Sequence, residues 1–372
     1  MYQLNEFYDV LNDPAAYGRR MKEDGRKVVG YFCSYTPEEI IYAAGAHPFR
    51  IFGTGESIHC ADAHFQSYCC SLVRGALEGA LSGSLDFLSG AVFPHTCDSI
   101  QRLSDIWRMN VKGPFHLDLV LPVKLDTESA RMYMIDVLRK FRNDLASRLK
   151  AEITDERLAG AIGTFNVIRG ALRRLYELKA ENPWIIGGSD LYAIVKAAMI
   201  MDRNRLCEIL PSVIRDIENK KGVTGDTASK RVVLAGGVCN NPDIYRIVEQ
   251  SGGVVVWDDF CTGSRYFEET TKGNADPIAS IAGRFLARPV CPAKHTGIFT
   301  RGENLLRIVR EKNARGVVFF FLKFCDPHAF DYPYLKGFLD REGIPSMMFE
   351  VEDQLPSEGQ LRTRFETFID ML

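Results

Sequence analysis

Two Cys-Asp pairs stand at equivalent places in the chain, each after an apolar segment that predicts a buried strand. The first is Cys97-Asp98, within the sequence AVFPHTCDSIQRLSDIW, and the second is Cys325-Asp326, after the apolar run 317–322. A helical pattern and another strand-like segment follow both pairs. Because open α/β sheets bind their ligands at the carboxyl ends of strands, both cysteines occupy positions suited to binding.

Two facing thiolates, joined by a third nearby, favour a soft metal or an iron–sulfur cluster. Cys69 and Cys70 stand at the predicted entry of a helix, within the segment 57–90 that is rich in small and apolar residues. The free N–H groups and the dipole of a helix N-terminus stabilise a thiolate at that place. Either of these two cysteines is therefore a candidate third ligand.

Ordinary packing is the alternative interpretation, because an isolated buried cysteine usually behaves as a small apolar side chain. The chain has ten cysteines but no Cys-x-x-Cys motif, and its first residues show no secretory signal. These features favour neither disulfides nor a zinc site with short ligand spacings. Repetition of the Cys-Asp pair favours a shared metal site for Cys97 and Cys325, and the spare cysteines are interpreted as packing or loop residues.

Internal repetition predicts how the cysteines are positioned. Residues 28–53 parallel residues 232–260, each with an apolar strand, a helix that starts near a proline, and a second strand. We therefore predict an α/β fold with two duplicated, flavodoxin-like lobes of about four parallel strands each, facing one another across a cleft. Between them, apolar residues with a 3.6-residue period predict a helical insert. The predicted division is a helical lead-in (1–27), the first α/β lobe (28–125), the helical insert (126–230) and the second α/β lobe (231–372).

The composition is that of a soluble globular protein, with 372 residues of which 46% are hydrophobic and 25% charged. A net charge of −2 gives no basic footprint for nucleic acid or for an anionic membrane. The longest apolar windows are too short to span a bilayer, and Lys196 interrupts one of them. We therefore expect a cytoplasmic protein that binds neither nucleic acid nor membrane.

Four spaced segments carry a resemblance to a known family: GYFCSYTPEEIIYAAGAHPFRI, HTCDSIQRLSDIWR, DDFCTGSRYFEE and FLKFCDPHAFDYPYLK. Together they resemble the 2-hydroxyacyl-CoA dehydratase and benzoyl-CoA reductase family, of the 2-hydroxyglutaryl-CoA dehydratase D-component type. The resemblance extends over nearly the whole chain, from Val28 to the end. It implies the two-lobed α/β fold with a helical part, and a [4Fe–4S] cluster held by three cysteines of each subunit.

The resemblance assigns the cluster ligands one at a time. Cys97 and Cys325 match the Cys-Asp positions of the two lobes, and Cys70 matches a cysteine that precedes a helix. In the family a proline commonly follows this last cysteine, whereas Ser71 follows it here. Cys69 therefore stays an alternative to Cys70 as the third ligand.

Three polar residues are further candidates for the site. Ser34 matches a serine that lies close to the cluster and substrate in the resembling dehydratases, with capping of the helix near Pro37 as the alternative. His95, just before Cys97, is a candidate to donate a proton or to hydrogen-bond a thioester carbonyl, with a structural backbone contact as the alternative. Arg265, at a predicted helix entry, is a weaker candidate to hold a CoA phosphate.

The implied function is that of a [4Fe–4S] subunit of an enzyme that acts on acyl-CoA. Its reaction would be dehydration of a 2-hydroxyacyl-CoA through a ketyl radical, or low-potential reduction of an aromatic acyl-CoA such as benzoyl-CoA. The resemblance implies two partners, a second homologous subunit in a hetero- or homodimer and an ATP-dependent iron–sulfur activator protein that supplies the electron. The alternatives are a non-catalytic electron-relay subunit, an ATP-dependent small-molecule reductase with a larger fused iron–sulfur cluster, and a binding protein without a cluster.

Overall fold

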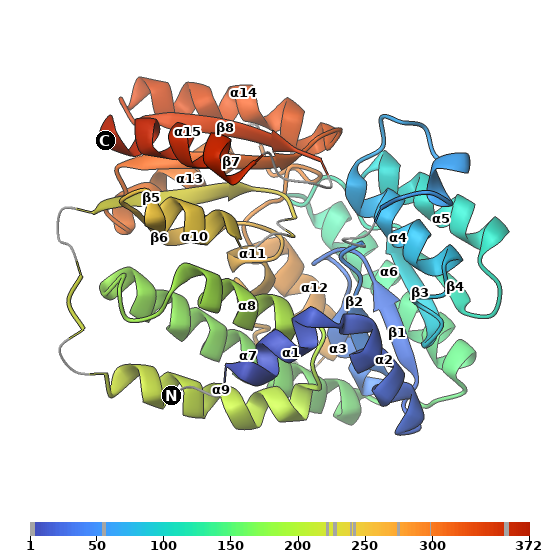
Figure 1. Cartoon of the computed structure of the whole chain (residues 1–372). Coiled ribbons are helices and arrows are strands. Elements are labelled where there is room, and N and C mark those ends of the chain that lie inside the picture. Colours follow the sequence, from blue (N-terminus) through green and yellow to red (C-terminus); the bar gives the residue numbers. More distant parts are fainter. Residues whose placement is uncertain are drawn as a thin grey trace.

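The computed structural model describes residues 4–53, 57–220, 223–225, 229–238, 240, 243–273, 276–297, 299–352 and 357–372. These ranges contain two sheets of four parallel strands each, with helices around them (Figure 1). A run of long helices separates the two sheets in the sequence. The prediction of an α/β fold with two duplicated lobes is therefore confirmed.

The first lobe is built on a sheet with the strand order β2-β1-β3-β4, the order of the first strands in a flavodoxin-like fold. Its parallel strands are β1 (Val28–Tyr31), β2 (His47–Arg50), β3 (Leu88–Pro94) and β4 (Phe115–Leu119). The connections contain α3 (Glu38–Ala43), the 3₁₀ turn η1 (Ala61–Ala63), α4 (Ser71–Leu81) and α5 (Asp98–Asn110). Every residue of β1 and β2 is buried, as is usual for parallel strands that are covered on both faces.

The second lobe repeats this arrangement with the strand order β6-β5-β7-β8. Its parallel strands are β5 (Lys230–Gly236), β6 (Gly253–Asp259), β7 (Gly316–Leu322) and β8 (Ser346–Val351). Its helices are α10 (Asp243–Gln250), α11 (Ser264–Phe267), α12 (Pro277–Ala287), α13 (Thr300–Glu311), α14 (Asp326–Arg341) and α15 (Glu358–Asp370). The apolar run GVVFFFL of β7 is buried along its whole length, which explains why it is continuous rather than alternating.

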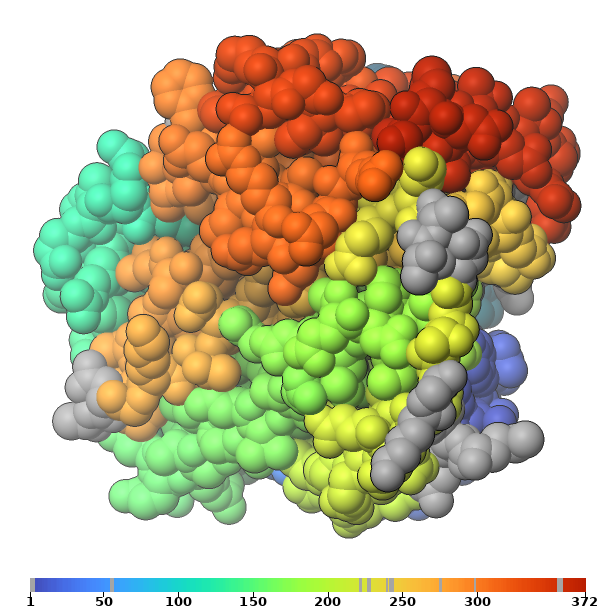
Figure 2. All heavy atoms as spheres, turned by 90° about the vertical axis from the view of Figure 1, so that its left-hand side faces the viewer, coloured from blue at the N-terminus to red at the C-terminus, as the bar shows by residue number. Residues whose placement is uncertain are grey.

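A helical segment connects the lobes through α6 (Glu128–Leu149), α7 (Asp155–Glu181), α8 (Gly188–Ala198) and α9 (Arg203–Glu218). The long helix α7 contacts α3 of the first lobe, α11 and α12 of the second, and its neighbour α9. Figure 2 shows this segment (green) directly below the second lobe (orange to red) on one face of the molecule. The division of the chain into four parts stays a prediction. Among the described helices, none combines the length and the apolar character needed to cross a bilayer.

Two short helices precede the first sheet, α1 (Asn5–Asn12) and α2 (Pro14–Glu23). Asp13 begins α2 as its N-cap, where its Oδ1 atom accepts a hydrogen bond of 2.8 Å from the backbone N–H of Ala16. Helix α1 then packs against α8 of the helical segment. The N-terminal helices therefore lie against both the first lobe and the segment that follows it.

Buried ion pairs attach α3 of the first lobe to the helical segment. Arg203 donates to Glu38 across 2.7 Å, and Arg169 donates to Glu39 across 2.6 Å. The Tyr31 hydroxyl donates to the same Glu38 oxygen, also across 2.7 Å. All five side chains are buried. Because removing one member of a buried pair leaves an uncompensated charge, these contacts fix α3 against α7 and α9.

Candidate functional site

The three cysteines predicted as ligands occupy the same kind of position in three different connections. Cys70 is the N-cap residue of α4, Cys97 of α5 and Cys325 of α14. In the two Cys-Asp copies the helix begins at the aspartate, Asp98 or Asp326. A helix N-terminus has backbone N–H groups without intrahelical partners, which can donate hydrogen bonds to a thiolate or to a sulfur ligand.

These three thiols lie close enough to influence one another's ionisation. Burial raises the pKa of Cys325 well above its ordinary value, and the neighbouring Cys70 and Cys97 raise it further. Burial likewise raises the pKa of Cys97, again with a contribution from Cys70. Burial raises the pKa of Cys70 to about 11, against hydrogen bonds from backbone N–H groups that lower it. The structure therefore brings together cysteines separated by most of the chain, and burial favours their neutral thiol form.

Cys69 and Cys70 differ in their surroundings although both are buried. The Cys69 thiol donates to Gln66 Oε1 across 3.8 Å. Of these two neighbours, Cys70 is the one whose charge acts on the thiols of Cys97 and Cys325. This influence on the neighbouring thiols favours Cys70, and the assignment of all three ligands stays a prediction.

Several spare cysteines line the same region. Cys291 is buried, and burial together with the neighbouring Cys261 and Cys33 raises its pKa to about 12, against the charge of Arg265. The neighbouring Cys33 also raises the pKa of Cys97, and Cys261 raises that of Cys325. The sequence interpretation treats Cys261 and Cys291 as loop or strand-end residues that shape the cleft without binding metal, and places the strand end of Cys33 toward the cleft; that interpretation stays a prediction. Cys60 is exposed, Cys207 lies in α9, and Cys239 falls outside the described residues.

No set of three or more His, Cys, Asp or Glu side chains within the described ranges is arranged to hold one metal ion. The three thiols therefore do not form a compact site for a single zinc-like ion, whose ligands would surround one centre. In an iron–sulfur cluster each cysteine binds a different metal atom, so the thiols need not surround one common centre.

Ser34 lies just after β1 in a buried turn. Arg288 donates to the Ser34 hydroxyl across 2.8 Å and to the Ser34 carbonyl across 2.7 Å. The guanidinium of Arg288 also stacks over the Tyr35 ring, with its carbon 4.1 Å from the ring centroid. Helix α3 begins after Pro37 without a side-chain cap, so Ser34 does not cap it. The role of Ser34 near a cluster or substrate stays a prediction.

His95 directly follows β3, next to the neighbouring strand β4. Its Nε2 atom is 2.8 Å from Asp118 Oδ1, and its backbone N–H donates to Leu119. Asp118 also accepts a hydrogen bond from Ser104. Burial alone would raise the pKa of Asp118, but the hydrogen bonds from Ser104 and His95 hold it below its usual value. The ring of His95 thus contacts a carboxylate rather than the backbone, and its catalytic role stays a prediction.

Arg265 is not available for a phosphate. It is fully buried and donates to both Asp259 oxygens, one of them across 3.0 Å, and to the Cys261 sulfur across 3.4 Å. Opposite charge on Asp259 outweighs burial and holds the pKa of Arg265 well above its usual value. The sequence suggestion that Arg265 holds CoA phosphate is therefore not supported.

A cavity of about 710 Å³ is lined by residues of both lobes, and no cysteine is among its lining residues in the described structure. Ser71, which follows Cys70, lines it from the first lobe, and Leu322 at the end of β7 lines it from the second. Arg50, the last residue of β2, also lines it and is missed by the sequence interpretation. The only sequence signal is a charged side chain at the end of an otherwise apolar strand. This cavity is large enough for a small ligand.

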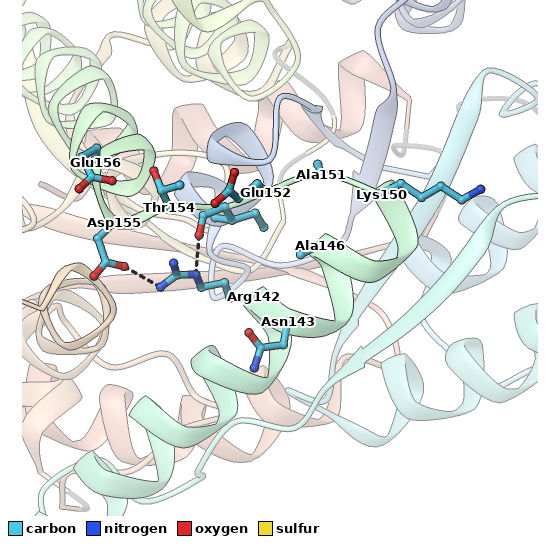
Figure 3. A pocket seen from close by; sticks show the side chains of 10 residues that line it. Arg142, Asn143, Ala146, Lys150, Ala151, Glu152, Thr154, Asp155 and Glu156 are labelled. Carbon is cyan, nitrogen blue, oxygen red and sulfur yellow. Dashed lines mark hydrogen bonds and ion pairs between the residues drawn. The ribbon is translucent and has the colours of Figure 1, made fainter.

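A second hollow, of about 850 Å³, lies where α6 ends and α7 begins (Figure 3). Its polar groups bind one another, since Arg142 donates to the Ile153 carbonyl across 2.7 Å and to Asp155 across 2.6 Å. Its lining residues in the described structure lie within 142–156 and include no cysteine. This hollow therefore offers no ligands for the chemistry suggested by the cysteines.

Comparisons with known proteins agree with the resemblance read from the sequence. The family model described as 2-hydroxyglutaryl-CoA dehydratase, D-component, matches residues 33–372. The chain is 28% identical to the (R)-phenyllactyl-CoA dehydratase beta subunit of Clostridium sporogenes, over 99% of this chain and 98% of that protein. It is 27% identical to one of the subunits of benzoyl-CoA reductase from Thauera aromatica, over 98% of this chain and 96% of that protein. It is also 27% identical to the beta subunit of (R)-2-hydroxyglutaryl-CoA dehydratase of Acidaminococcus fermentans, over 99% and 98%.

Proposed function

The chain belongs to the 2-hydroxyglutaryl-CoA dehydratase D-component family, and we propose that it is the [4Fe–4S]-bearing subunit of an enzyme acting on acyl-CoA. The reaction is dehydration of a 2-hydroxyacyl-CoA or low-potential reduction of an aromatic acyl-CoA such as benzoyl-CoA. Dehydratase and reductase subunits occur among its relatives at similar identity. These relatives support an enzyme subunit of this type. We further propose a second homologous subunit and an ATP-dependent activator as its partners.

The observation that carries this proposal is the convergence of three helix N-termini, each with a cysteine at its N-cap. Cys70, Cys97 and Cys325 supply three sulfur donors from both lobes, and sulfur is the ligand that iron–sulfur clusters require. Their mutual influence on ionisation supports a common site. Because burial holds them as thiols, binding of metal must release their protons. The donor set fits a cluster with three protein ligands.

When bound, such a cluster supplies single electrons at low potential and an iron open to a substrate oxygen. The protein has separate tasks in this scheme. Cys70, Cys97 and Cys325 would hold the cluster, and backbone N–H groups at the three helix starts would be placed to donate hydrogen bonds to its sulfurs. Cys70 is buried while Cys97 and Cys325 are partly buried, and Arg288 holds the Ser34 hydroxyl in a fixed orientation. Ser34 is thereby oriented to hydrogen-bond a substrate oxygen.

The cavity lined by both lobes supports a catalytic role over that of a sealed electron relay. It is lined by Ser71 and Leu322, which adjoin the Cys70 and Cys325 segments. A relay requires no space for a substrate next to its cluster. A dehydratase or reductase requires space for the acyl group, and about 710 Å³ provides it.

The proposal is tested on protein purified without oxygen together with its partner subunit. We expect iron and sulfide near the ratio of one cubane in this chain, a brown colour that air bleaches, and acyl-CoA conversion that needs activator and ATP. Cys70→Ala, Cys97→Ala and Cys325→Ala should each lower the iron content, because each removes one of three anchors. Cys69→Ala is the matched control and should retain iron. Full iron retention by both Cys97→Ala and Cys325→Ala would contradict the proposal.

A further inference from the structure

Arg50 stands out among the buried charges of the molecule. Its side chain is 2% exposed, yet its Nε and Nη1 atoms are buried without a hydrogen-bond partner in the described structure. No carboxylate of the described residues forms an ion pair with it. Its guanidinium carbon lies over two aromatic rings, 5.5 Å from the Tyr31 centroid and 5.9 Å from that of Phe52.

The other buried arginines of the described residues all have hydrogen-bond partners: three pair with carboxylates, while Arg284 donates to backbone carbonyls and Arg288 donates to Ser34. Arg203 binds Glu38, and Arg169 binds Glu39. Arg265 binds Asp259. A buried guanidinium without such a partner lowers stability, because its charge has lost water and gained no opposite charge. A group of this kind is suited to an anion that arrives as a ligand.

The surroundings of Arg50 strengthen this argument. Arg50 lines the cavity between the lobes, and Lys196 lines the same cavity with its Nζ atom 5.0 Å from the Phe52 centroid. Lys196 donates to the backbone carbonyl of Asn240, whose side-chain Oδ1 is buried and has no partner in the described structure. The cavity therefore offers two cations and one free acceptor near its inner wall.

The acids that line this cavity are already engaged. Asp13 accepts the backbone N–H of Ala16 as the N-cap of α2. Glu352 accepts a hydrogen bond of 2.5 Å from Lys323. Neither forms an ion pair with Arg50 in the described structure, so that the positive charge of Arg50 is left for a ligand.

Shape narrows the ligand class. The guanidinium fork of arginine matches phosphate and carboxylate oxygens in pairs. The cavity of about 710 Å³ is much larger than one anion, and its lining includes the apolar side chains of Phe49, Phe320 and Leu322. The ligand therefore has an anionic end and a sizeable, partly apolar body.

We propose that this cavity binds a phosphate ester, with Arg50 and Lys196 holding the phosphate, and that the ester is a coenzyme A thioester. The choice of coenzyme A rests on the proposed function, whereas the phosphate site rests on Arg50 alone. Arg50 is then a positioning residue, because it fixes the phosphate end while the acyl end reaches toward the cysteine segments. The same chemistry would also accept a nucleotide or inorganic phosphate.

Calorimetry on the anaerobically purified protein with its partner subunit tests this assignment. Coenzyme A, ATP and inorganic phosphate are titrated separately into the wild type, Arg50→Met and Arg50→Lys. We expect coenzyme A to bind the wild type, Arg50→Met to weaken that binding at least about tenfold, the effect of losing one charged hydrogen-bonded pair, and Arg50→Lys to lie between them. Arg19→Met removes an exposed arginine that pairs with Asp86, and it should bind coenzyme A as the wild type does.

Melting curves without ligand distinguish a ligand site from a structural role. If Arg50 serves to bind an anionic ligand, the Arg50→Met variant without ligand should melt at the same temperature as the wild type or higher, because an unpaired buried charge has been removed. A melting temperature lowered by several degrees would show that Arg50 is structural and would overturn the proposal. Unchanged coenzyme A affinity in Arg50→Met would overturn it as well.

The remaining outcomes separate this inference from the proposed function. Arg50-dependent binding of ATP or phosphate without binding of coenzyme A would overturn the coenzyme A assignment. Iron content is measured on the same samples. Iron-free wild type that binds coenzyme A through Arg50 would support the inference while the cluster proposal fails, and iron-loaded wild type that binds none of the three probes would overturn the inference alone.

Discussion

The second strand of each lobe ends at a charged residue, but only the residue in the second lobe has an ion-pair partner among the described residues. In the first lobe β2 ends at Arg50, whose guanidinium has no carboxylate partner among the described residues. In the second lobe β6 ends at Asp259, which binds both Arg265 and Arg301. Arg50 lines the cavity between the lobes, whereas both partners of Asp259 belong to the second lobe. The difference indicates that the first lobe keeps a charge free for a ligand, while the second uses its charge to hold itself together.

The helix before the third strand shows the same divergence. In the first lobe this helix is α4, and its N-cap is Cys70. In the second lobe it is α13, and its N-cap is Phe299, which is 53% exposed. The Cys-Asp position after the third strand is kept in both lobes, as Cys97 and Cys325. Duplication therefore accounts for two of the three candidate ligands, and the third belongs to the first lobe alone.

The largest effect on stability is expected from Arg265→Met in the second lobe. This change leaves Asp259 buried with Arg301 as its remaining partner, 3.2 Å away. Breaking a buried pair destabilises by about 3 to 5 kcal/mol, and the lower figure applies because Arg301 remains. Denaturant unfolding measures the loss, and the double variant Arg265→Met/Asp259→Asn should recover part of it. A decrease in the free energy of unfolding below about 1 kcal/mol is within the range of an exposed pair. It would show that the Arg265–Asp259 pair does not stabilise the second lobe, and the contrast between this paired charge and the unpaired Arg50 would no longer stand.

A smaller, pH-dependent effect is expected from Glu268→Gln, at the end of α11. Burial raises the pKa of Glu268 to about 7, with a further contribution from Asp259, against the charges of Arg265 and Arg288. Its Oε2 atom is buried without a hydrogen-bond partner in the described structure. The folded protein therefore keeps this proton at pH values where the unfolded chain has lost it.

The sign follows from linkage. Because the pKa of Glu268 is higher in the folded state, stability falls as pH rises from about 4.5 to about 7 and stays low above that range. The difference corresponds to about 3 kcal/mol at pH 8, at roughly 1.4 kcal/mol for each pH unit. Glu268→Gln should therefore melt higher than the wild type at pH 8 and alike at pH 4.5. Parallel melting profiles across this range would show that the second lobe tolerates the buried carboxylate.

The sequence predicts those features that depend on local pattern. Continuous apolar runs indicate buried parallel strands, and β7 is buried throughout as its run predicts. Repetition of the Cys-Asp pair places Cys97 and Cys325 at corresponding helix starts, which the structure confirms. Asp13-Pro14 likewise predicts the start of α2. These features need no knowledge of distant partners.

The sequence fails where a partner comes from far along the chain. Ser34 is held by Arg288, which lies 254 residues later, so that no local pattern connects them. Arg265 is a different case, because its partner Asp259 lies only six residues earlier and the sequence does not show that the connection between β6 and α11 brings the two side chains together. Arg50 gives no signal beyond its charge, since the absence of a partner is a property of the folded molecule.

The smallest effect is expected from Cys207→Ala, which removes a cysteine outside the region where the lobes meet. Cys207 lies on α9, half-buried, and its thiol donates to the Thr164 carbonyl across 3.9 Å, a long contact that contributes little. We expect a loss of about 1 kcal/mol or less, the usual cost of a small packing change, with iron content equal to that of the wild type. Denaturant unfolding and iron analysis on the same preparation measure both. Iron loss in Cys207→Ala as large as in Cys97→Ala would mean that any cysteine removal disturbs the site, and the contrast between the cysteines of the two lobes and the rest would no longer stand.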